Sequence, residues 1–396
     1  MIARLHIAVI TETYPPEVNG VAMTLGRMVQ GLLQRGHRVS LTRPRQNSQD
    51  EPVCSAQHST LLVRGLPIPG YAGLKFGLPA RRLFLRQWRA DRPDVVQVVT
   101  EGPLGASAIA AARELGIPVV SEFHTNFHAY SRHYGFGWLE NLVAAHLRRL
   151  HNRSRMTLVP SHQLGIDLLR RGYHGIRVVA RGVDTRLFNP ARRSTTLRAS
   201  WNAGDKDIVV AHVGRLAPEK NLPLVLTTFE AIRGYAPSAR LVLVGDGPSR
   251  RRLEQSHPEH IFAGMRHGED LAVHYASADL FLFPSMTETY GNVTLEALAS
   301  GLPVVAYRMA AAAELIRHGD NGMLANSGAS DQFIRAALDL VTHPDALRRA
   351  AAIAPQSVEA LDWERIYEQL VVALRDAIAS SACPPLNPAT FRFLPD

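Results

Sequence analysis

Short apolar runs alternate with segments of helical periodicity along most of this chain. A first series of apolar runs falls within residues 5–180, and a second within residues 207–325. Each run is short enough for a buried strand, and amphipathic helical patterns separate the runs, as at residues 22–35 and 104–115. Alternation of this kind predicts an α/β fold with two doubly wound parallel sheets.

With 396 residues and 46% apolar content, the chain is long enough for two domains that each bury a core. We place the first domain at residues 1–184 and the second at residues 185–357. A helical pattern follows within residues 358–380, and the proline-rich residues 381–396 predict an irregular tail. No internal repeat is visible, which excludes a solenoid or a propeller.

Residues 284–303 predict an anion site with two carboxylates beside it. The apolar run from Leu280 to Phe283 leads through a turn into a helical pattern, so a strand feeds a helix N-terminus. The free N–H groups at such an end suit a phosphate, and Gly291 lets a ligand approach the backbone closely. Glu288 and Glu296 suit hydroxyl groups, and a nucleotide sugar offers both phosphates and hydroxyls. The alternative is an ordinary strand-turn-helix crossover with Glu288 as a solvated loop residue.

Two further strand ends carry residues suited to a nucleotide diphosphate. Arg215 and Lys220 follow the first apolar run of the second series. Two such cations can clamp a diphosphate, the arginine as a fork and the lysine as a point charge. A later run ends in Gly245-Asp-Gly247-Pro, where the glycines leave room for a bulky ligand.

Together these segments resemble the family 4 retaining glycosyltransferases of GT-B architecture, over residues 7–379. The acidic element of that family, two glutamates that bracket seven residues, corresponds to Glu288 and Glu296. Its basic diphosphate clamp corresponds to Arg215 and Lys220.

The first domain carries two further points of resemblance. Residues 15–21, in a first strand-loop-helix unit that lacks GxGxxG, correspond to the glycine loop of the family. His124, which follows an apolar run, corresponds to its active-site histidine, which contacts the donor sugar in relatives. One departure is Met309–Ala313, because relatives often carry a Gly-Gly pair there.

The resemblance implies two Rossmann-like domains that face each other across a cleft, with the helix within residues 358–380 packed back on the first domain. It implies retaining transfer of a hexosyl group from a nucleotide diphosphate sugar, without a metal or another cofactor. The implied catalytic residues are His124, Arg215, Lys220 and Glu288. The implied donor-binding residues are Gly20, Gly214, Gly245, Gly247, Tyr290, Gly291, Asn292, Val293 and Glu296.

Residues 19–21 and 180–190 look most like the branch of the family that glycosylates membrane lipids, such as diacylglycerol mannosyl-, glucosyl- and sulfoquinovosyltransferases. The resemblance favours GDP-mannose as donor, with a UDP-sugar next, and a membrane lipid or glycolipid as acceptor. One alternative is a polysaccharide or a lipid-linked oligosaccharide acceptor. Two more are a GT-B-type nucleotide-sugar epimerase and a non-catalytic nucleotide-sugar-binding protein.

Positive charge is concentrated in the first half of the chain. Residues 1–190 hold 24 Lys and Arg against 12 Asp and Glu, whereas residues 191–396 hold 20 against 23. The basic, amphipathic stretch 75–89 predicts docking on an anionic membrane surface, and no nucleic-acid-binding motif accompanies the charge. The residues expected at that surface are Arg81, Arg82, Arg86, Trp88 and Arg89. The alternative is a half-buried helix whose arginines are merely solvated.

The remaining expectations concern the acceptor, the compartment and metals. Glu122, His128 and Tyr130 are candidate acceptor contacts. Two cysteines are too few for a disulfide framework, and no apolar run is long enough to span a bilayer. We therefore expect a cytoplasmic protein, bound peripherally to the inner face of the cytoplasmic membrane. Because no His-rich ligand spacing is visible, we expect no catalytic metal.

Overall fold

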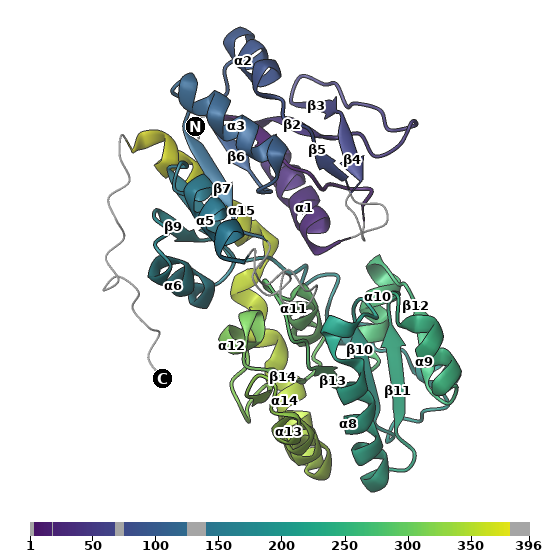
Figure 1. Ribbon diagram of the computed structural model, residues 1–396. Helices are drawn as coiled ribbons and strands as arrows, with labels where there is room; N and C mark the ends of the chain where they lie inside the picture. The colour runs from purple at the N-terminus through teal and green to yellow at the C-terminus, as the bar shows by residue number, and fades with distance from the viewer. Residues whose placement is uncertain (1–3, 18, 68–74, 125–139, 381–396) are drawn as a thin grey trace. The chain divides into compact units, whose positions relative to one another are not determined.

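Figure 1 shows the computed structural model, which describes residues 4–17, 19–67, 75–124 and 140–380. The described chain forms two compact units. Unit 1 contains residues up to 181 and from 364 onward, and unit 2 contains residues 182–363. Each unit has its own parallel sheet, which confirms the predicted α/β class with two doubly wound sheets. Among the described helices, none is both long and apolar enough to cross a membrane.

The main sheet of unit 1 has seven strands in the order β3-β2-β1-β6-β7-β8-β9, and neighbouring strands run parallel. The four residues of β6 are all buried, as expected for a sheet with helices on both faces. The strands are β1 (His6–Ile10), β2 (Arg38–Pro44), β3 (His58–Val63), β6 (Val95–Val98), β7 (Val119–Glu122), β8 (Met156–Val159) and β9 (Ile176–Val178).

Helices cover this sheet, and the last helix of the chain is one of them. The helices are α1 (Gly20–Gln34), α2 (Arg81–Ala90), α3 (Pro103–Glu114), α5 (Glu140–His151), α6 (His162–Arg170) and α15 (Trp363–Ala379). Asn19 caps α1, because its side-chain oxygen accepts from the N–H groups of Val21 and Ala22. A Cβ on Gly31 of α1 would lie 2.5 Å from the ring of Tyr367, so α15 packs closely against α1.

The stretch 75–89 differs from its prediction. It begins with β5 (Lys75–Gly77), which pairs antiparallel with β4 (Gly65–Pro67), and continues into α2. Phe84 and Trp88 are buried in the core and stack at a centroid distance of 4.9 Å. The prediction that Trp88 contacts a membrane is therefore wrong. The helix buries its apolar face against its own unit, in a core cluster that also contains Leu104 and Ala108 of α3.

The arginines of α2 lie on its exposed face. Arg81 and Arg89 contact the two carboxylate oxygens of Glu114, at 2.6 Å and 3.3 Å. Arg82 and Arg86 are exposed as well. The alternative interpretation, a half-buried helix with solvated arginines, thus describes the local structure of α2.

The sheet of unit 2 has six parallel strands in the order β12-β11-β10-β13-β14-β15. The strands are β10 (Val209–Val213), β11 (Arg240–Val244), β12 (Ile261–Gly264), β13 (Leu280–Phe283), β14 (Val304–Tyr307) and β15 (Gly322–Ala325). The helices are α7 (Thr195–Ser200), α8 (Leu222–Tyr235), α9 (Arg250–Ser256), α10 (Gly268–Ala276), α11 (Asn292–Ala299), α12 (Ala310–Leu315), α13 (Ser330–Thr342) and α14 (Pro344–Ile353).

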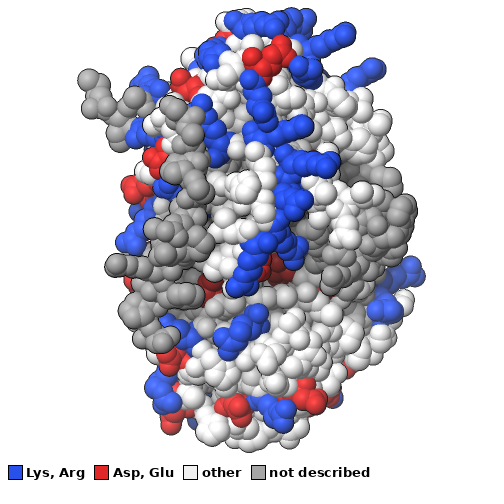
Figure 2. Space-filling view, turned by 60° about the vertical axis from the view of Figure 1, so that its left-hand side comes forward, with Lys and Arg blue, Asp and Glu red and all other residues white. Residues whose placement is uncertain are grey.

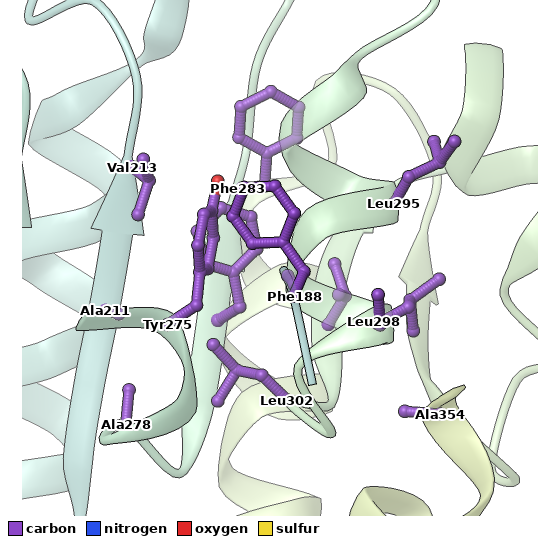
Figure 3. Close-up of a cluster of buried hydrophobic side chains, with 14 of the residues drawn as sticks. Phe188, Ala211, Val213, Tyr275, Ala278, Phe283, Leu295, Leu298, Leu302 and Ala354 are labelled. Atoms are coloured by element: carbon purple, nitrogen blue, oxygen red, sulfur yellow. The ribbon is translucent and has the colours of Figure 1, made fainter. Parts of the chain in front are cut away.

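Figure 3 shows the core on one face of this sheet. Tyr275 of α10 and Phe283 of β13 belong to one buried cluster with Leu295 and Leu298 of α11. Tyr275 also meets Phe188 edge-on, at a centroid distance of 5.8 Å. This packing fixes α11 against β13, so the loop between them starts and ends on rigid elements.

The two ends of unit 2 lie side by side. The N–H of Val183 donates to the carbonyl of Leu361 at 2.9 Å, and Val183 forms an isolated parallel bridge with Asp362. A Cβ on Gly182 would lie 2.5 Å from the Trp363 ring, so the two chain segments touch there as well. The chain therefore enters and leaves unit 2 at one place.

Candidate active site

The loops that leave β10 and β13 form the centre of the candidate site. The strand order of the unit 2 sheet reverses between these two strands. In open α/β sheets, ligands bind outside the carboxyl ends of the strands at such a reversal. The loop after β10 carries Arg215 and Lys220, and the loop after β13 carries Glu288. The fold thus brings together two segments that lie far apart in the sequence.

Lys220 and Glu288 form an ion pair at this point. Lys220 Nζ donates to Glu288 Oε1, and the two side chains are only 15% and 14% exposed. Ser285 Oγ donates to the same carboxylate oxygen at 2.8 Å. The ammonium also lies 5.3 Å from the centre of the Phe283 ring. Because an ammonium has three donors, the pair leaves Lys220 able to bind phosphate oxygens as well.

Arg215 is more exposed than Lys220. Its Nη1 lies 3.8 Å from Glu219 Oε1, and 48% of its side chain is exposed. A contact of this length at the surface contributes little binding energy. With nearly half of its side chain exposed, the guanidinium is accessible to an anion in solvent.

The start of α11 has the backbone geometry that an anion site needs. Gly291 precedes the helix with φ at 92°, a left-handed conformation in which a Cβ is unfavourable. Asn292 and Val293 then form the first turn, whose N–H groups carry the positive end of the helix dipole. The Tyr290 side chain is buried in the core, so its ring serves packing.

Glu296 lies one turn further along α11. The Tyr275 hydroxyl donates to Glu296 Oε2 at 3.0 Å. Burial raises the pKa of Glu296 to about 7, although the hydrogen bond from Tyr275 works in the opposite direction. Near neutral pH this carboxyl group is present in both protonation states, so it can accept from or donate to a ligand hydroxyl.

The glycines after β11 serve backbone packing. A Cβ on Gly245 would lie 2.0 Å from the carbonyl oxygen of Gly214, and one on Gly247 would lie 2.5 Å from that of Leu216. The loops after β10 and β11 therefore touch through their backbones. The prediction that these two glycines leave side-chain room for a ligand is wrong, because protein atoms fill that space. Contacts from their backbone to a donor stay a prediction.

Met309–Ala313, the departure from the family pattern, forms the start of α12. Ala310 has φ at 47°, a left-handed conformation that glycine adopts more easily. A glycine would adopt this conformation at lower cost than the alanine does. Met309 also lines a small pocket with Ser285 and Glu288, so this helix end lies beside the ion pair.

In unit 1, His124 belongs to a buried network at the end of β7. His124 Nδ1 lies 2.9 Å from Arg181 Nη2. Because a guanidinium only donates, Nδ1 must accept, and Nε2 carries the proton that it donates to Glu122. Gln97 Nε2 donates to the other oxygen of Glu122. Both ring nitrogens of His124 are thus engaged by the protein.

Glu122 is part of the same network. Burial alone would raise its pKa, but His124, Gln97 and Arg181 together hold the pKa below its usual range. The residue is buried. The prediction that Glu122 contacts an acceptor is therefore wrong, since its carboxylate is inaccessible and already bonded on both oxygens.

The glycine loop lies close to this network. A Cβ on Gly20 would lie 3.9 Å from Arg181 Nη1, so Arg181 stands between Gly20 and His124. Two other candidate acceptor contacts, His128 and Tyr130, lie outside the described residues.

A carboxyl group also occupies the point where the strand order of the unit 1 sheet reverses, between β1 and β6. Glu12 follows β1, its N–H donates to Thr100 Oγ1 at 2.8 Å, and its Oε1 accepts from the N–H of Leu104 at 3.2 Å. Burial raises its pKa to about 7, and the neighbouring Glu101 adds to this effect.

Sequence reasoning missed several residues of these networks, namely Ser285, Arg181, Tyr275, Glu12 and Gln97. Ser285 stands two positions after a strand end, which is a usable signal, and Arg181 lies in the run 180–190 that carries part of the family resemblance. Tyr275 and Glu12 have no local signal, because their partners Glu296 and Leu104 are distant in the sequence.

Comparison with known proteins decides the family. A family model described as Glycosyltransferase Family 4 matches residues 18–187, and one described as Glycosyl transferases group 1 matches residues 207–343. A GDP-mannose-dependent alpha-mannosyltransferase from Mycobacterium tuberculosis is 33% identical, over 93% of this chain and 95% of the relative. The chain belongs to the family 4 glycosyltransferases.

This glycosyltransferase is similar to other proteins along its whole length. A GDP-mannose-dependent alpha-(1-6)-phosphatidylinositol dimannoside mannosyltransferase from Mycobacterium tuberculosis is 27% identical, over 96% of this chain and 98% of the relative. The solved structure of sucrose-phosphate synthase from Thermosynechococcus elongatus matches with a TM-score of 0.77 at 19% identity, covering 96% of this chain and 100% of that chain. These findings confirm a GT-B hexosyltransferase.

Proposed function

We propose that this glycosyltransferase moves a mannosyl group, with retention of configuration, from GDP-mannose to a membrane lipid or glycolipid. The observation that carries the proposal is the Lys220–Glu288 pair at the strand reversal of unit 2, which sets a cation for a diphosphate beside a carboxylate for sugar hydroxyls. The names of two relatives support the donor, since both are GDP-mannose-dependent. One of them is named for a phosphatidylinositol-based acceptor, which supports the lipid.

The residues of unit 2 suggest how the sugar–phosphate bond would break. Negative charge develops on the leaving diphosphate, and Arg215, Lys220 and the N–H groups at the start of α11 would stabilise it electrostatically. Glu288 would bind the transferred sugar, and Glu296 the ribose hydroxyls. Because these fixed donors meet the charge, we expect transfer to be independent of a metal ion.

The ion pair itself would assist this step. Glu288 and the Phe283 ring hold the Lys220 ammonium in place before a donor arrives. A cation that is already positioned costs little reorganisation when charge develops nearby. For His124, whose ring nitrogens are both engaged, we propose a positioning role at the end of β7.

A lipid acceptor stays in the membrane, so the enzyme must come to the bilayer surface. We expect peripheral docking through the exposed arginines of α2, without a contribution from Trp88. On the face drawn in Figure 2, Lys and Arg side chains gather in a band with few Asp and Glu side chains between them, so basic surface is not confined to α2. A basic surface of this kind is attracted to the anionic cytoplasmic face of a membrane.

Transfer from labelled donors tests the proposal. The purified enzyme would be incubated with GDP-mannose or UDP-glucose and with vesicles that contain phosphatidylinositol, diacylglycerol or their monoglycosylated forms. We expect labelled lipid with GDP-mannose, at a rate that EDTA leaves nearly unchanged. A product only with UDP-glucose would revise the donor. Transfer to soluble saccharides with none to lipid would favour the polysaccharide alternative, and sugar isomerisation without an acceptor would favour an epimerase.

A further inference from the structure

Three side chains with metal-ligating atoms meet at the turn between α9 and β12. His257 Nδ1 lies 3.7 Å from Glu259 Oε1, and His260 Nε2 lies 3.6 Å from the same oxygen. All three ligand atoms lie within 4.8 Å of one another. The two imidazole rings are parallel to within 7°, with centroids 5.7 Å apart. This cluster took no part in the sequence-based site, because its His-x-Glu-His spacing matches no familiar motif.

Backbone hydrogen bonds connect the three residues in a tight turn. The N–H of His260 donates to the carbonyl of His257 at 3.2 Å, and the N–H of His257 continues α9 by donating to Leu253. Pro258, between them, fixes its own backbone angle. The turn therefore places the three residues close together, and their ligand atoms lie near one another in the absence of an ion.

His260 supplies a second, independent observation. Its side chain is only 2% exposed, yet Nε2 has no hydrogen-bond partner among the described residues. A buried polar nitrogen costs free energy unless a ligand or a water molecule satisfies it. The His260 ring meets the Phe229 ring of α8 at right angles, at a centroid distance of 5.2 Å, and this packing restricts its orientation. Nε2 is therefore held facing Glu259.

We propose that His257, Glu259 and His260 bind a divalent transition-metal ion, with Zn²⁺ as the reference ion. Zinc bonds of about 2.0–2.2 Å to nitrogen and oxygen place tetrahedral ligand atoms about 3.3 Å apart. The two distances to Glu259 exceed that value by only a few tenths of an ångström. Two imidazoles and one carboxylate select a transition metal over Mg²⁺ or Ca²⁺, which prefer oxygen ligands.

The site lies away from the chemistry of transfer. His260 directly precedes β12, whereas Lys220 and Glu288 follow β10 and β13, so the two sites lie at opposite ends of the parallel strands. The side chains of His257 and Glu259 are 37% and 45% exposed, which leaves a fourth position open to water. A bound ion would tie α9 to the edge strand β12 and stabilise unit 2.

Metal binding and thermal unfolding test the proposal without recourse to activity. Metal-free protein would be titrated with Zn²⁺ by equilibrium dialysis, with His257→Ala and Glu259→Gln beside the wild type. Both variants change exposed side chains, so the fold should persist. We expect one Zn²⁺ per wild-type chain and an increase in Tm on binding. Each variant should bind more than about tenfold more weakly, since even the loss of an outer-shell partner costs 10–100-fold.

His267→Ala is the matched control, because His267 is an exposed histidine of the same unit that lies outside the cluster. It should bind Zn²⁺ as the wild type does. Absence of Zn²⁺ binding by the wild type would overturn the proposal. So would an equal affinity in all four proteins, because the ion would then bind elsewhere. Neither outcome bears on the proposed transfer from a nucleotide sugar, whose residues lie at the opposite ends of the parallel strands.

Discussion

At the scale of single residues, the site combines one ion pair and one buried carboxyl group. Lys220 and Glu288 neutralise each other while no donor is bound, so the site avoids an unpaired, largely buried charge. For Glu296, the raised pKa reduces the buried negative charge, and the Tyr275 hydroxyl donates a hydrogen bond to the carboxyl group. A ligand that brings phosphates and hydroxyls would change both arrangements.

Replacing Lys220 tests the role of the Lys220–Glu288 ion pair in transfer. Lys220→Ala should lower kcat by roughly 10²–10³-fold, as is typical when one donor to a developing negative charge is removed. Lys206→Ala is the control, because it removes an exposed lysine of the same unit. Initial rates at saturating donor measure the effect, and thermal unfolding checks the fold. A Lys220→Ala enzyme that kept more than half of its turnover would contradict the assignment.

Replacing Glu296 tests the effect of the buried carboxyl group on stability. The folded state raises the pKa of this group from 4.5 to about 7, so it binds the proton more tightly than the unfolded chain does. Its contribution to stability is fully present below pH 4.5 and is lost as the pH rises toward 7. Glu296→Gln should remove this loss, and at pH 8 the variant should exceed the wild type by on the order of 3 kcal/mol in free energy of unfolding.

Denaturant unfolding of Glu296→Gln between pH 4.5 and 8 measures this difference. Glu359→Gln, at an exposed position of unit 2, is the control and should follow the wild type. Parallel curves for Glu296→Gln and the wild type would show that the carboxyl group is solvated.

In the transfer reaction, Glu296→Ala should chiefly raise the KM for the donor, because ribose contacts are equal in the ground and transition states.

At the scale of elements, the site is made by the junctions between strands and helices. The loop after β13 turns at Gly291 into α11, and the loop after β14 turns at Ala310 into α12. Both residues are left-handed, but only the first is glycine. The left-handed conformation therefore costs more conformational energy at Ala310 than at Gly291.

Exchanging glycine and alanine at the two junctions tests this difference in conformational energy. Gly291→Ala should lower the free energy of unfolding by roughly 1–2 kcal/mol, because a Cβ is unfavourable at φ 92°. Ala310→Gly should raise it by up to about 1 kcal/mol, since relief of the left-handed strain exceeds the flexibility that glycine adds to the unfolded chain. Denaturant unfolding measures both.

Gly234→Ala separates this effect from a general property of glycine. Gly234 lies inside α8, with no atom within 4 Å of an added Cβ, and the alanine should stabilise the helix by about 0.5–1 kcal/mol. If Gly291→Ala were also stabilising, the left-handed backbone would not be what requires glycine there.

The sequence predicted most strands and helices of both sheets, because apolar runs at regular spacing are a strong signal. It missed the hairpin of β4 and β5, whose strands of three residues show no periodicity. It also misassigned α2, because an amphipathic pattern does not tell whether the apolar face packs against the protein's own core or contacts a membrane. The Lys220–Glu288 contact could be placed only when the strand order was known.

At the scale of the whole molecule, we expect the uneven charge of the chain to contribute more to membrane docking than any single arginine does. The first 190 residues carry twice as many basic as acidic side chains, and the rest is nearly balanced. Part of this excess is used internally, since Glu114 contacts Arg81 and Arg89. What remains exposed can act at a membrane only within a Debye length of about 8–10 Å.

Two sets of charge variants test membrane docking. Replacing Arg81, Arg82, Arg86 and Arg89 by Ser should abolish co-sedimentation with phosphatidylglycerol vesicles, because each basic residue near such a surface contributes about 1 kcal/mol. Binding of the wild type should fall steeply with salt and be absent with phosphatidylcholine vesicles.

The control set replaces four exposed arginines of unit 2 by Ser: Arg251, Arg252, Arg348 and Arg349. It removes the same net charge and should leave binding nearly unchanged. Equal loss in both sets would indicate attraction by overall charge, and no loss in either set would argue against electrostatic docking.

The adjacency of Val183 and Asp362 has a consequence for how such enzymes can be rebuilt. Because both ends of residues 182–363 meet at one point, this segment is a cassette that can be cut out and replaced without lengthening the remaining chain. The other part is discontinuous, and α15 must be rejoined to residue 181 by any substitute. Under the proposed function, an exchange of unit 2 that alters donor specificity would need two splice points, and in this chain they lie side by side.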